Sequence, residues 1–339
     1  MKILCYSDTH IRDTGSFEPW NAIGPNGISY ELENIITGYR FIADMVLEHR
    51  PDLVVCLGDV VQHTEFQTVQ TLFGISKCYK LLKSAVNSVG AQHIAILGNH
   101  DIHNEKKKIH NLHILSGYGV NVIDEFFIGE FGGNIIAFIP YTSNLAEVYS
   151  SLSVAQQSAK LILTHLDFQG ARYDSGQISQ SQISPHLTVP CISGDIHLQQ
   201  SVSSVTYVGS LIQNRFNRPN LDGVGGVLIY DMDNKATTAI RNNYSKHYIR
   251  VRDSEWDSVP ESKSCILKVI SSKPRHEIDD RFSGYEYFVV PDIKVKEESI
   301  ATYSEFVRID PKRALRHHIE SNNPEAVVTF DKYSEKIPV

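Results

Sequence analysis

The chain begins with the stretch Lys2-Ile3-Leu4-Cys5-Tyr6-Ser7-Asp8-Thr9-His10, an apolar run that stops at a carboxylate and an imidazole. The pattern recurs downstream. The run Leu53–Leu57 stops at Gly58-Asp59, and the run His93–Leu97 stops at Gly98-Asn99-His100-Asp101. Each run has the length and the Ile, Leu and Val content of a buried strand, so each predicts a strand that ends at residues able to bind a metal ion.

Two further runs end in the same way. Lys160–Thr164 is followed by His165, and Val189–Ser193 is followed by Gly194-Asp195-Ile196-His197. In open α/β sheets, sites form at the carboxyl ends of strands. We therefore expect five strand ends, carrying Asp, His and Asn side chains, to converge on one place.

Helical patterns separate these runs and indicate a layered α/β fold with helices outside the sheet. Apolar residues recur at helical spacing over Ile35–Glu48, Val69–Val89 and Asn104–Leu115. Later segments predict short strands, namely Val202–Val208, Gly226–Asp231 and Ala236–Ile240.

Strand and helix patterns alternate less regularly beyond Tyr244, so we place a domain boundary at residue 245. Residues 246–339 predict a small α+β module with strands at His247–Arg252, Ser264–Ile270 and Tyr285–Val290 and helices at Ile300–Val307 and Pro311–Ser321. We expect residues 1–245 to carry the chemistry. The module 246–339 is expected to act as a cap that positions a large substrate or binds a partner.

Composition describes an ordinary globular protein. Hydrophobic residues make up 42% and charged residues 21% of the chain, and the net charge of −7 gives no sign of a basic nucleic-acid binder. No apolar stretch is long enough to span a membrane, and the first residues do not resemble a signal peptide. The five cysteines form no close pair, which favours reduced thiols. We expect a cytoplasmic protein with no membrane partner.

The residue types at the strand ends suit a hard or borderline divalent ion such as Mn²⁺, Mg²⁺ or Fe²⁺, because they offer oxygen and imidazole but no thiolate. Asp8 and His10 are two positions apart, so on a strand both would point to the same side. Asp59 has two carboxylate oxygens and can bridge two ions. Two ions about 3.5–4 Å apart can activate a water and bind a phosphoryl oxygen.

His100 directly follows the predicted ligand Asn99, and its side chain is expected to point elsewhere. We assign it the role of a general acid that protonates a leaving oxygen. Asp101 is expected to orient the ring of His100.

Taken together in this order, the five motifs resemble those of the calcineurin-like metallophosphoesterases. Three stretches resemble one branch of that family, the SbcD-type nuclease subunits of recombination and repair, including phage versions. They are His165-Leu166-Asp167-Phe168-Gln169-Gly170-Ala171, then Tyr207-Val208-Gly209-Ser210 with Asn214-Arg215-Phe216, and Gly225-Gly226-Val227 to Asp231. The resemblance covers about residues 1–240.

The resemblance implies a sandwich of two mixed β-sheets flanked by helices, and a division of ligands between two ions. One ion would take Asp8, His10, Asp59 and His197, and the other Asp59, Asn99, His165 and residue 195. It further implies Mn²⁺ as the cofactor with Mg²⁺ possible, DNA as substrate, a homodimer, and an SMC-type coiled-coil ATPase subunit similar to SbcC. A phage-encoded protein of this kind would act in the host cytoplasm.

The chain departs from the family pattern at two places. Gly194-Asp195-Ile196-His197 stands where the family usually has Gly-His-x-His, so Asp195 replaces an imidazole. The branch often has a histidine three residues after the aspartate of the second motif, close to the scissile phosphate. Here Gln62 occupies that position and His63 follows it, so either residue could contact the phosphate.

Three alternatives remain open at this stage. The first is a phosphoesterase that acts on small phosphodiesters or phosphoproteins, although the phosphatase branch usually continues its Gly-Asp with Arg-Gly and this chain continues with Val60-Val61. The second is a non-catalytic scaffold, which loss of ligands would mark. The third concerns Val69–Val89, whose apolar residues are either core or part of a helix bundle in a homodimer.

Overall fold

The computed structural model describes residues 1–15, 18–65, 67–104, 109–213, 225–259, 261 and 265–292. The chain divides into two compact units, Met1–Val290 and Pro291–Val339. The predicted helices Ile300–Val307 and Pro311–Ser321 lie outside the described residues.

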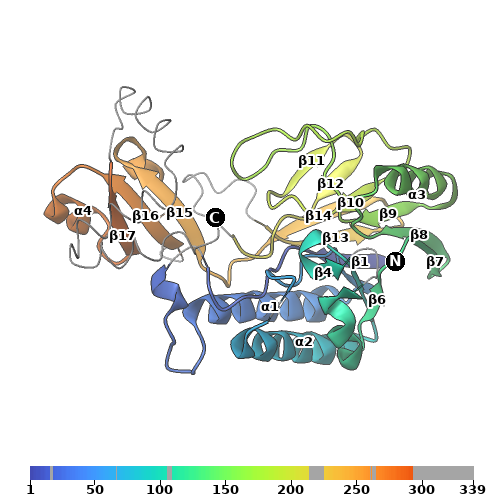
Figure 1. Cartoon of the computed structure of the whole chain (residues 1–339), viewed down its shortest axis with the longest axis horizontal. Coiled ribbons are helices and arrows are strands. Elements are labelled where there is room, and N and C mark those ends of the chain that lie inside the picture. Colours follow the sequence, from blue (N-terminus) through green and yellow to red (C-terminus); the bar gives the residue numbers. More distant parts are fainter. Residues whose placement is uncertain are drawn as a thin grey trace, which may run out of the picture. The chain divides into compact units, whose positions relative to one another are not determined.

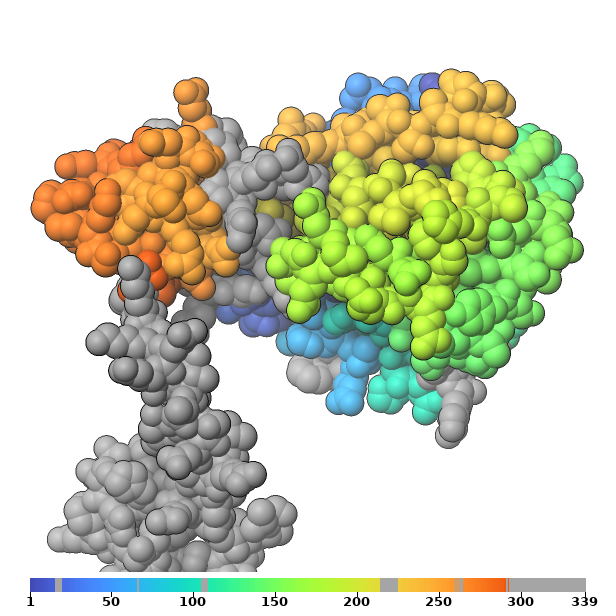
Figure 2. Space-filling view, turned by 90° about the horizontal axis from the view of Figure 1, so that it is seen from above, coloured from blue at the N-terminus to red at the C-terminus, as the bar shows by residue number. Residues whose placement is uncertain are grey.

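The first sheet has six strands in the order β14-β13-β1-β2-β3-β6. Four of them run parallel: β1 (Lys2–Tyr6), β2 (Leu53–Cys56), β3 (Gln92–Ile96) and β6 (Asn121–Ile123). The first three of these precede the early motifs. β13 (Gly226–Asp231) pairs antiparallel with β1, and β14 (Ala236–Arg241) closes that edge. β14 is largely exposed, and Figure 2 shows this part of the chain, in light orange, along the surface.

The second sheet also has six strands, in the order β11-β12-β10-β9-β8-β7. Its parallel centre consists of β8 (Asn134–Ile139), β9 (Leu161–Thr164), β10 (Cys191–Ser193) and β12 (Val205–Tyr207). The edges β7 (Phe127–Phe131) and β11 (Gln200–Val202) pair antiparallel with their neighbours. Both sheets are therefore mixed.

The sheets and helices form layers (Figure 1), and the side chains of each strand alternate between the layers on its two faces. On β1, Ile3 and Cys5 face the second sheet, where Phe138 and Leu163 belong to the same apolar cluster. Leu4 and Tyr6 of β1 pack instead with α1 (Tyr30–His49) and α2 (Val69–Val89). α3 (Leu145–Ser158) covers the outer face of the second sheet. The predicted sandwich of two mixed sheets flanked by helices is confirmed.

The predicted helix Asn104–Leu115 is wrong in its first half. β4 (Ile102–Asn104) pairs antiparallel with β5 (Ile109–His110), and a 3₁₀ helix, η4 (Asn111–Tyr118), follows. Ile102 is partly buried and packs against the core with an extended backbone. The helical pattern begins at residue 104 and does not include this contact. The predicted strand Val202–Val208 is likewise two strands, β11 and β12, with a turn at Ser203, whose φ is 54°.

A separate sheet begins directly after the predicted domain boundary. β15 (His247–Arg252), β16 (Cys265–Ser271) and β17 (Glu286–Pro291) form a three-stranded sheet, with α4 (Arg275–Arg281) between the last two strands. These elements share an apolar cluster of their own. The boundary at 245 as the limit of a domain stays a prediction, and the first compact unit extends to Val290.

Candidate metal centre

The five strand-end motifs converge at one edge of the sandwich. Three of them follow β1, β2 and β3 of the first sheet, and two follow β9 and β10 of the second. Asp8, His10, Asp59, His100, His165 and His197 contribute to clusters whose potential ligand atoms lie within 4.8 Å of one another. The convergence expected from the sequence is present, and both sheets contribute to it.

The first group of potential ligands surrounds the imidazole of His10. Its Nε2 lies 3.1 Å from Nε2 of His197, 3.6 Å from Oδ2 of Asp59 and 4.0 Å from Oδ1 of Asp8. His197 Nε2 lies 3.7 Å from the same Asp8 oxygen. Four donor atoms thus face a common point.

The second group surrounds His165. Its Nε2 lies 3.2 Å from Oδ1 of Asn99, 3.5 Å from Oδ1 of Asp59 and 3.7 Å from Oδ1 of Asp195. Asp59 directs Oδ2 to the first group and Oδ1 to the second, which is the position of a bridging carboxylate. All seven predicted ligands are therefore brought together in the two sets that the sequence resemblance implied.

The backbone, rather than the pleat of a strand, directs these side chains. β1 ends at Tyr6, and Asp8 and His10 follow it with φ values of 51° and 42°. Asp59 and Asp195 also have positive φ, at 53° and 77°. This left-handed conformation is uncommon for residues other than glycine and is typical of strained functional turns. Asp8 and His10 both reach the centre, as expected. They do so through the turn after β1 and not through the periodicity of a strand, so the reason given for the expectation was wrong.

Close approach between turns explains a glycine of the second motif. Gly58 has a φ of 92°, and a Cβ there would lie 2.6 Å from both the Gly98 nitrogen and Nδ1 of His165. Only glycine leaves room for the turns after β2 and β3 to pack against the His165 ring.

Asp8 provides the test of whether a metal ion fits. Its carboxylate is fully buried, and neither oxygen has a hydrogen-bond donor among the described residues. A buried carboxylate without a partner is costly unless a cation meets it. Nδ1 of His165 lies 2.5 Å from the carbonyl oxygen of Leu57, so it carries the proton and leaves the lone pair of Nε2 directed at the second group. The donor set fits divalent ions in two adjoining positions.

The charges of the centre are unbalanced without such ions. Burial raises the pKa of Asp8 to about 6 and that of Asp59 to about 7. Burial lowers the pKa of His165, but the carboxylates of Asp59, Asp8 and Asp195 outweigh it and raise that pKa to about 9. Below these pKa values, bound protons compete with divalent ions for the same groups.

His100 lies beside the first group, with its ring centroid 4.8 Å from that of His10. Its Nδ1 lies 2.8 Å from the backbone carbonyl of Gln62, which orients the ring. The prediction that Asp101 orients His100 is wrong. The Asp101 carboxylate is fully buried and accepts instead from the backbone N–H groups of Gly98, Asp59, Val60 and Val61.

His63 lies in the segment between β2 and α2. Its side chain is exposed, and its backbone carbonyl accepts from the side-chain amides of Gln67 and Asn111. The backbone carbonyl of Gln62 contacts His100. Contact of Gln62 or His63 with the phosphate stays a prediction. The contact of the Gln62 backbone with His100 was not predicted from the sequence.

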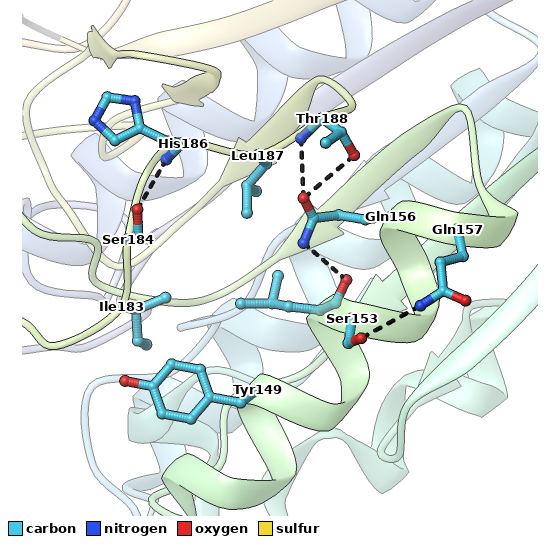
Figure 3. Close-up of a pocket in the computed structure, with 10 residues that line it drawn as sticks. Tyr149, Ser153, Gln156, Gln157, Ile183, Ser184, His186, Leu187 and Thr188 are labelled. Carbon is cyan, nitrogen blue, oxygen red and sulfur yellow. Dashed lines mark hydrogen bonds between the residues drawn. The ribbon is translucent and has the colours of Figure 1, made fainter.

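The centre has a buried half and an open half. Asp8, His10, Asp59 and His165 are buried, whereas the side chains of Asp195 and His197 are 23% and 27% exposed. The open rim is where a substrate can approach. A cavity of about 380 Å³ lies elsewhere, between α3 and residues 183–188, and no carboxylate lines it (Figure 3). That cavity is not a metal site.

The profile of one protein family, the calcineurin-like phosphoesterases, matches residues 1–199. The chain belongs to this family. As a calcineurin-like phosphoesterase it is a hydrolase of phosphoester bonds, and its Asp and His clusters are able to hold metal ions. No curated protein matches the chain. Among the described helices, none has the length and apolar character needed to cross a membrane.

Two solved structures show weak similarity. YfcE, a phosphoesterase from E. coli, has 13% sequence identity and a TM-score of 0.32, with 71% of this chain and 100% of that chain covered. A protein of unknown function from Aquifex aeolicus, AQ665, has 17% identity and a TM-score of 0.27, with 49% and 80% covered. Scores this low support no inference about this phosphoesterase, and its family membership rests on the profile match alone.

Metal binding by this centre should depend on pH. The raised pKa values of Asp8, Asp59 and His165 mean that ions displace protons from the folded protein. All three groups bind protons at about pH 5, whereas at about pH 8 only His165, with its pKa of about 9, still does so. The gain in melting temperature from Mn²⁺ over EDTA should therefore grow as pH rises between these values. A gain that is equal or larger at the lower pH would contradict the proton competition.

Asp195 should be a ligand of the second group. Asp195→Ala is expected to weaken one of two Mn²⁺ affinities in a calorimetric titration, while Asp195→Asn, which keeps an oxygen donor, loses less. Asp195→His, which restores the usual family residue, should retain two ions. Two unchanged affinities in the alanine variant would show that Asp195 does not touch the metal.

Proposed function

We propose that this phosphoesterase is a two-metal DNA phosphodiesterase, the nuclease subunit of an SbcCD-like recombination and repair complex. The observation that carries the proposal is the pair of ligand groups that share Asp59 beside an open rim. Two bound divalent ions would supply Lewis-acid charge and an activated water for in-line displacement at phosphorus, and the imidazole ligands favour Mn²⁺.

His100 supplies the proton for the leaving oxygen in this proposal. A carbonyl oxygen can only accept, so Nδ1 of His100 carries hydrogen toward Gln62, and Nε2 is the nitrogen that passes a proton. The ring meets His10 edge-on at 88°, which places it at the border of the first ligand group. His100 is half-buried and so remains reachable from the rim.

Support for DNA as substrate comes from a segment that resembles the SbcD-type branch. Gly209-Ser210 follows β12 and returns the chain to the centre: Ser210 N donates to the carbonyl of His197, and Leu211 N donates to that of Ser7. The branch-like turn thereby holds two metal-binding loops in place. An open rim also suits a long polymer better than a closed pocket would.

The alternative is a phosphoesterase for small phosphodiesters or phosphoproteins. The phosphatase branch usually places an arginine after the aspartate of the second motif, and Val60 occupies that position here and is fully buried. No cationic side chain reaches the rim from that position. The alternative is therefore less well supported.

The proposed assembly is a homodimer that works with an SMC-type coiled-coil ATPase subunit. The inner face of α2 is core, with Ile75, Tyr79 and Leu82 buried. Its first turns expose Val69, Leu72 and Phe73, of which Val69 is 84% exposed. Apolar residues at positions i, i+3 and i+4 of a helix form one stripe, which suits contact with a second copy.

Digestion of DNA tests the function. Purified protein should hydrolyse linear single- or double-stranded DNA and bis(p-nitrophenyl) phosphate, with Mn²⁺ more effective than Mg²⁺, and should act poorly on p-nitrophenyl phosphate. An Asp8→Asn variant purified in parallel excludes a contaminating nuclease. Cleavage that persists in excess EDTA, or a clear preference for the phosphomonoester, would refute the proposal.

His100→Ala should lower the turnover number by about 10²–10⁴-fold while both ions remain bound, because a proton donor and not a ligand is lost. Elemental analysis and calorimetry give the metal content. His100 lies within ligand distance of His10 and Asp59, so loss of an ion in the variant would instead identify His100 as a ligand.

A further inference from the structure

Glu31, in the first turn of α1, is fully buried and carries two contacts that join distant parts of the chain. Oε1 accepts from Nη2 of Arg12 at 2.5 Å, and Oε2 accepts from the hydroxyl of Tyr248. Arg12 and Tyr248 are themselves 4% and 1% exposed. Tyr248 belongs to β15, so a buried charge pair links the C-terminal sheet to the loop that follows β1.

Arg12 extends this connection to a metal ligand. Its Nη1 donates to the backbone carbonyl of His10 at 3.3 Å. His10 has a φ of 42°, an uncommon conformation that persists only where the surroundings enforce it. The contacts therefore run from Tyr248 through Glu31 and Arg12 to the strained backbone of His10.

The same loop makes a second contact with the C-terminal sheet. Nε1 of Trp20 donates to Oε1 of Glu286 on β17 at 2.6 Å, and the Trp20 and Tyr248 rings meet edge-on at 5.9 Å. Asp13 accepts from Thr68, the residue that caps α2, at 2.8 Å. The loop after His10 is thus fixed by α1, α2 and the C-terminal sheet together.

Fold stability alone does not account for a pair of this kind. Removing two charges from water costs about as much as their attraction returns, and apolar residues of similar size often serve stability equally well. What the pair provides is a defined position for Arg12. Groups that orient metal ligands from behind commonly change metal affinity about 10–100-fold when they are altered.

We infer that Tyr248 and Glu31 are positioning residues of the metal centre. Through Arg12 they hold the His10 backbone, so the C-terminal sheet sets the geometry of the group formed by Asp8, His10, Asp59 and His197. This goes beyond the expected role of residues 246–339 as a cap for substrate or partner. The inference rests on metal binding in the proposed function and is independent of the identity of the substrate.

Tyr248→Phe removes one hydroxyl from the full-length chain and keeps the ring. We expect the affinity of one of two Mn²⁺ sites to fall about 10-fold or more in a calorimetric titration, with the other site unchanged. With bis(p-nitrophenyl) phosphate at saturating Mn²⁺, kcat should fall while KM changes little. Glu31→Gln, which leaves the Arg12 charge uncompensated, should show a larger effect of the same pattern.

Tyr230→Phe is the matched control, because Tyr230 is buried on β13 opposite Ile3, toward the start of β1 and away from the centre. Its Mn²⁺ affinities should equal those of the wild type. If Tyr248→Phe or Glu31→Gln lowers the melting temperature but leaves both Mn²⁺ affinities unchanged, the inference is overturned. One of the two variants is sufficient for this test if the other does not fold. Wild-type protein that binds two Mn²⁺ ions but does not cleave DNA would refute the proposed function alone.

Discussion

The carboxylate of Asp101 accepts hydrogen bonds from four backbone N–H groups, three of them in the turn after β2 and one at Gly98 after β3. These bonds join the second and third motifs before any ion binds. They also fix Asp59, whose Oδ1 accepts from the backbone of His100. Hydrogen bonds to its own backbone N–H and to its carboxylate therefore fix the position of Asp59. Asp59 belongs to both ligand groups, so its position affects both.

This arrangement has an electrostatic consequence. Asp8 and Asp59 are buried, and burial raises the pKa of both carboxyl groups. The ionised forms of these carboxylates are therefore unfavourable without a cation, and divalent ions would stabilise them. Residues with strained backbones, such as His10, need support from outside their own loop. Arg12 and Glu31 provide it here.

The sequence predicted the convergence of the strand-end motifs, because these motifs depend on local pattern and on the fixed direction of parallel strands. It predicted poorly where tertiary contacts override local pattern. The apolar spacing of Asn104–Leu115 suits a helix, yet Ile102 extends to reach the core and pairs with His110. The role of Asp101 was misjudged because backbone N–H groups leave no trace in a sequence. The hairpin of β7 and β8 was missed although Gly132-Gly133 has the glycine pair typical of its turn.

Asp195, which replaces the usual family histidine, lies on the open side of the centre. Its side chain is partly exposed, so an added carboxylate costs less there than at fully buried Asp8 or His165. Two divalent ions bring four positive charges, and Asp8, Asp59 and Asp195 bring three negative ones, which leaves one net positive charge. An imidazole at 195 would leave two. A single net charge matches a phosphodiester, which carries one negative charge, better than a phosphomonoester, which carries nearly two at neutral pH. With Asp195 as a ligand, as proposed, the charge of the centre would favour diester substrates.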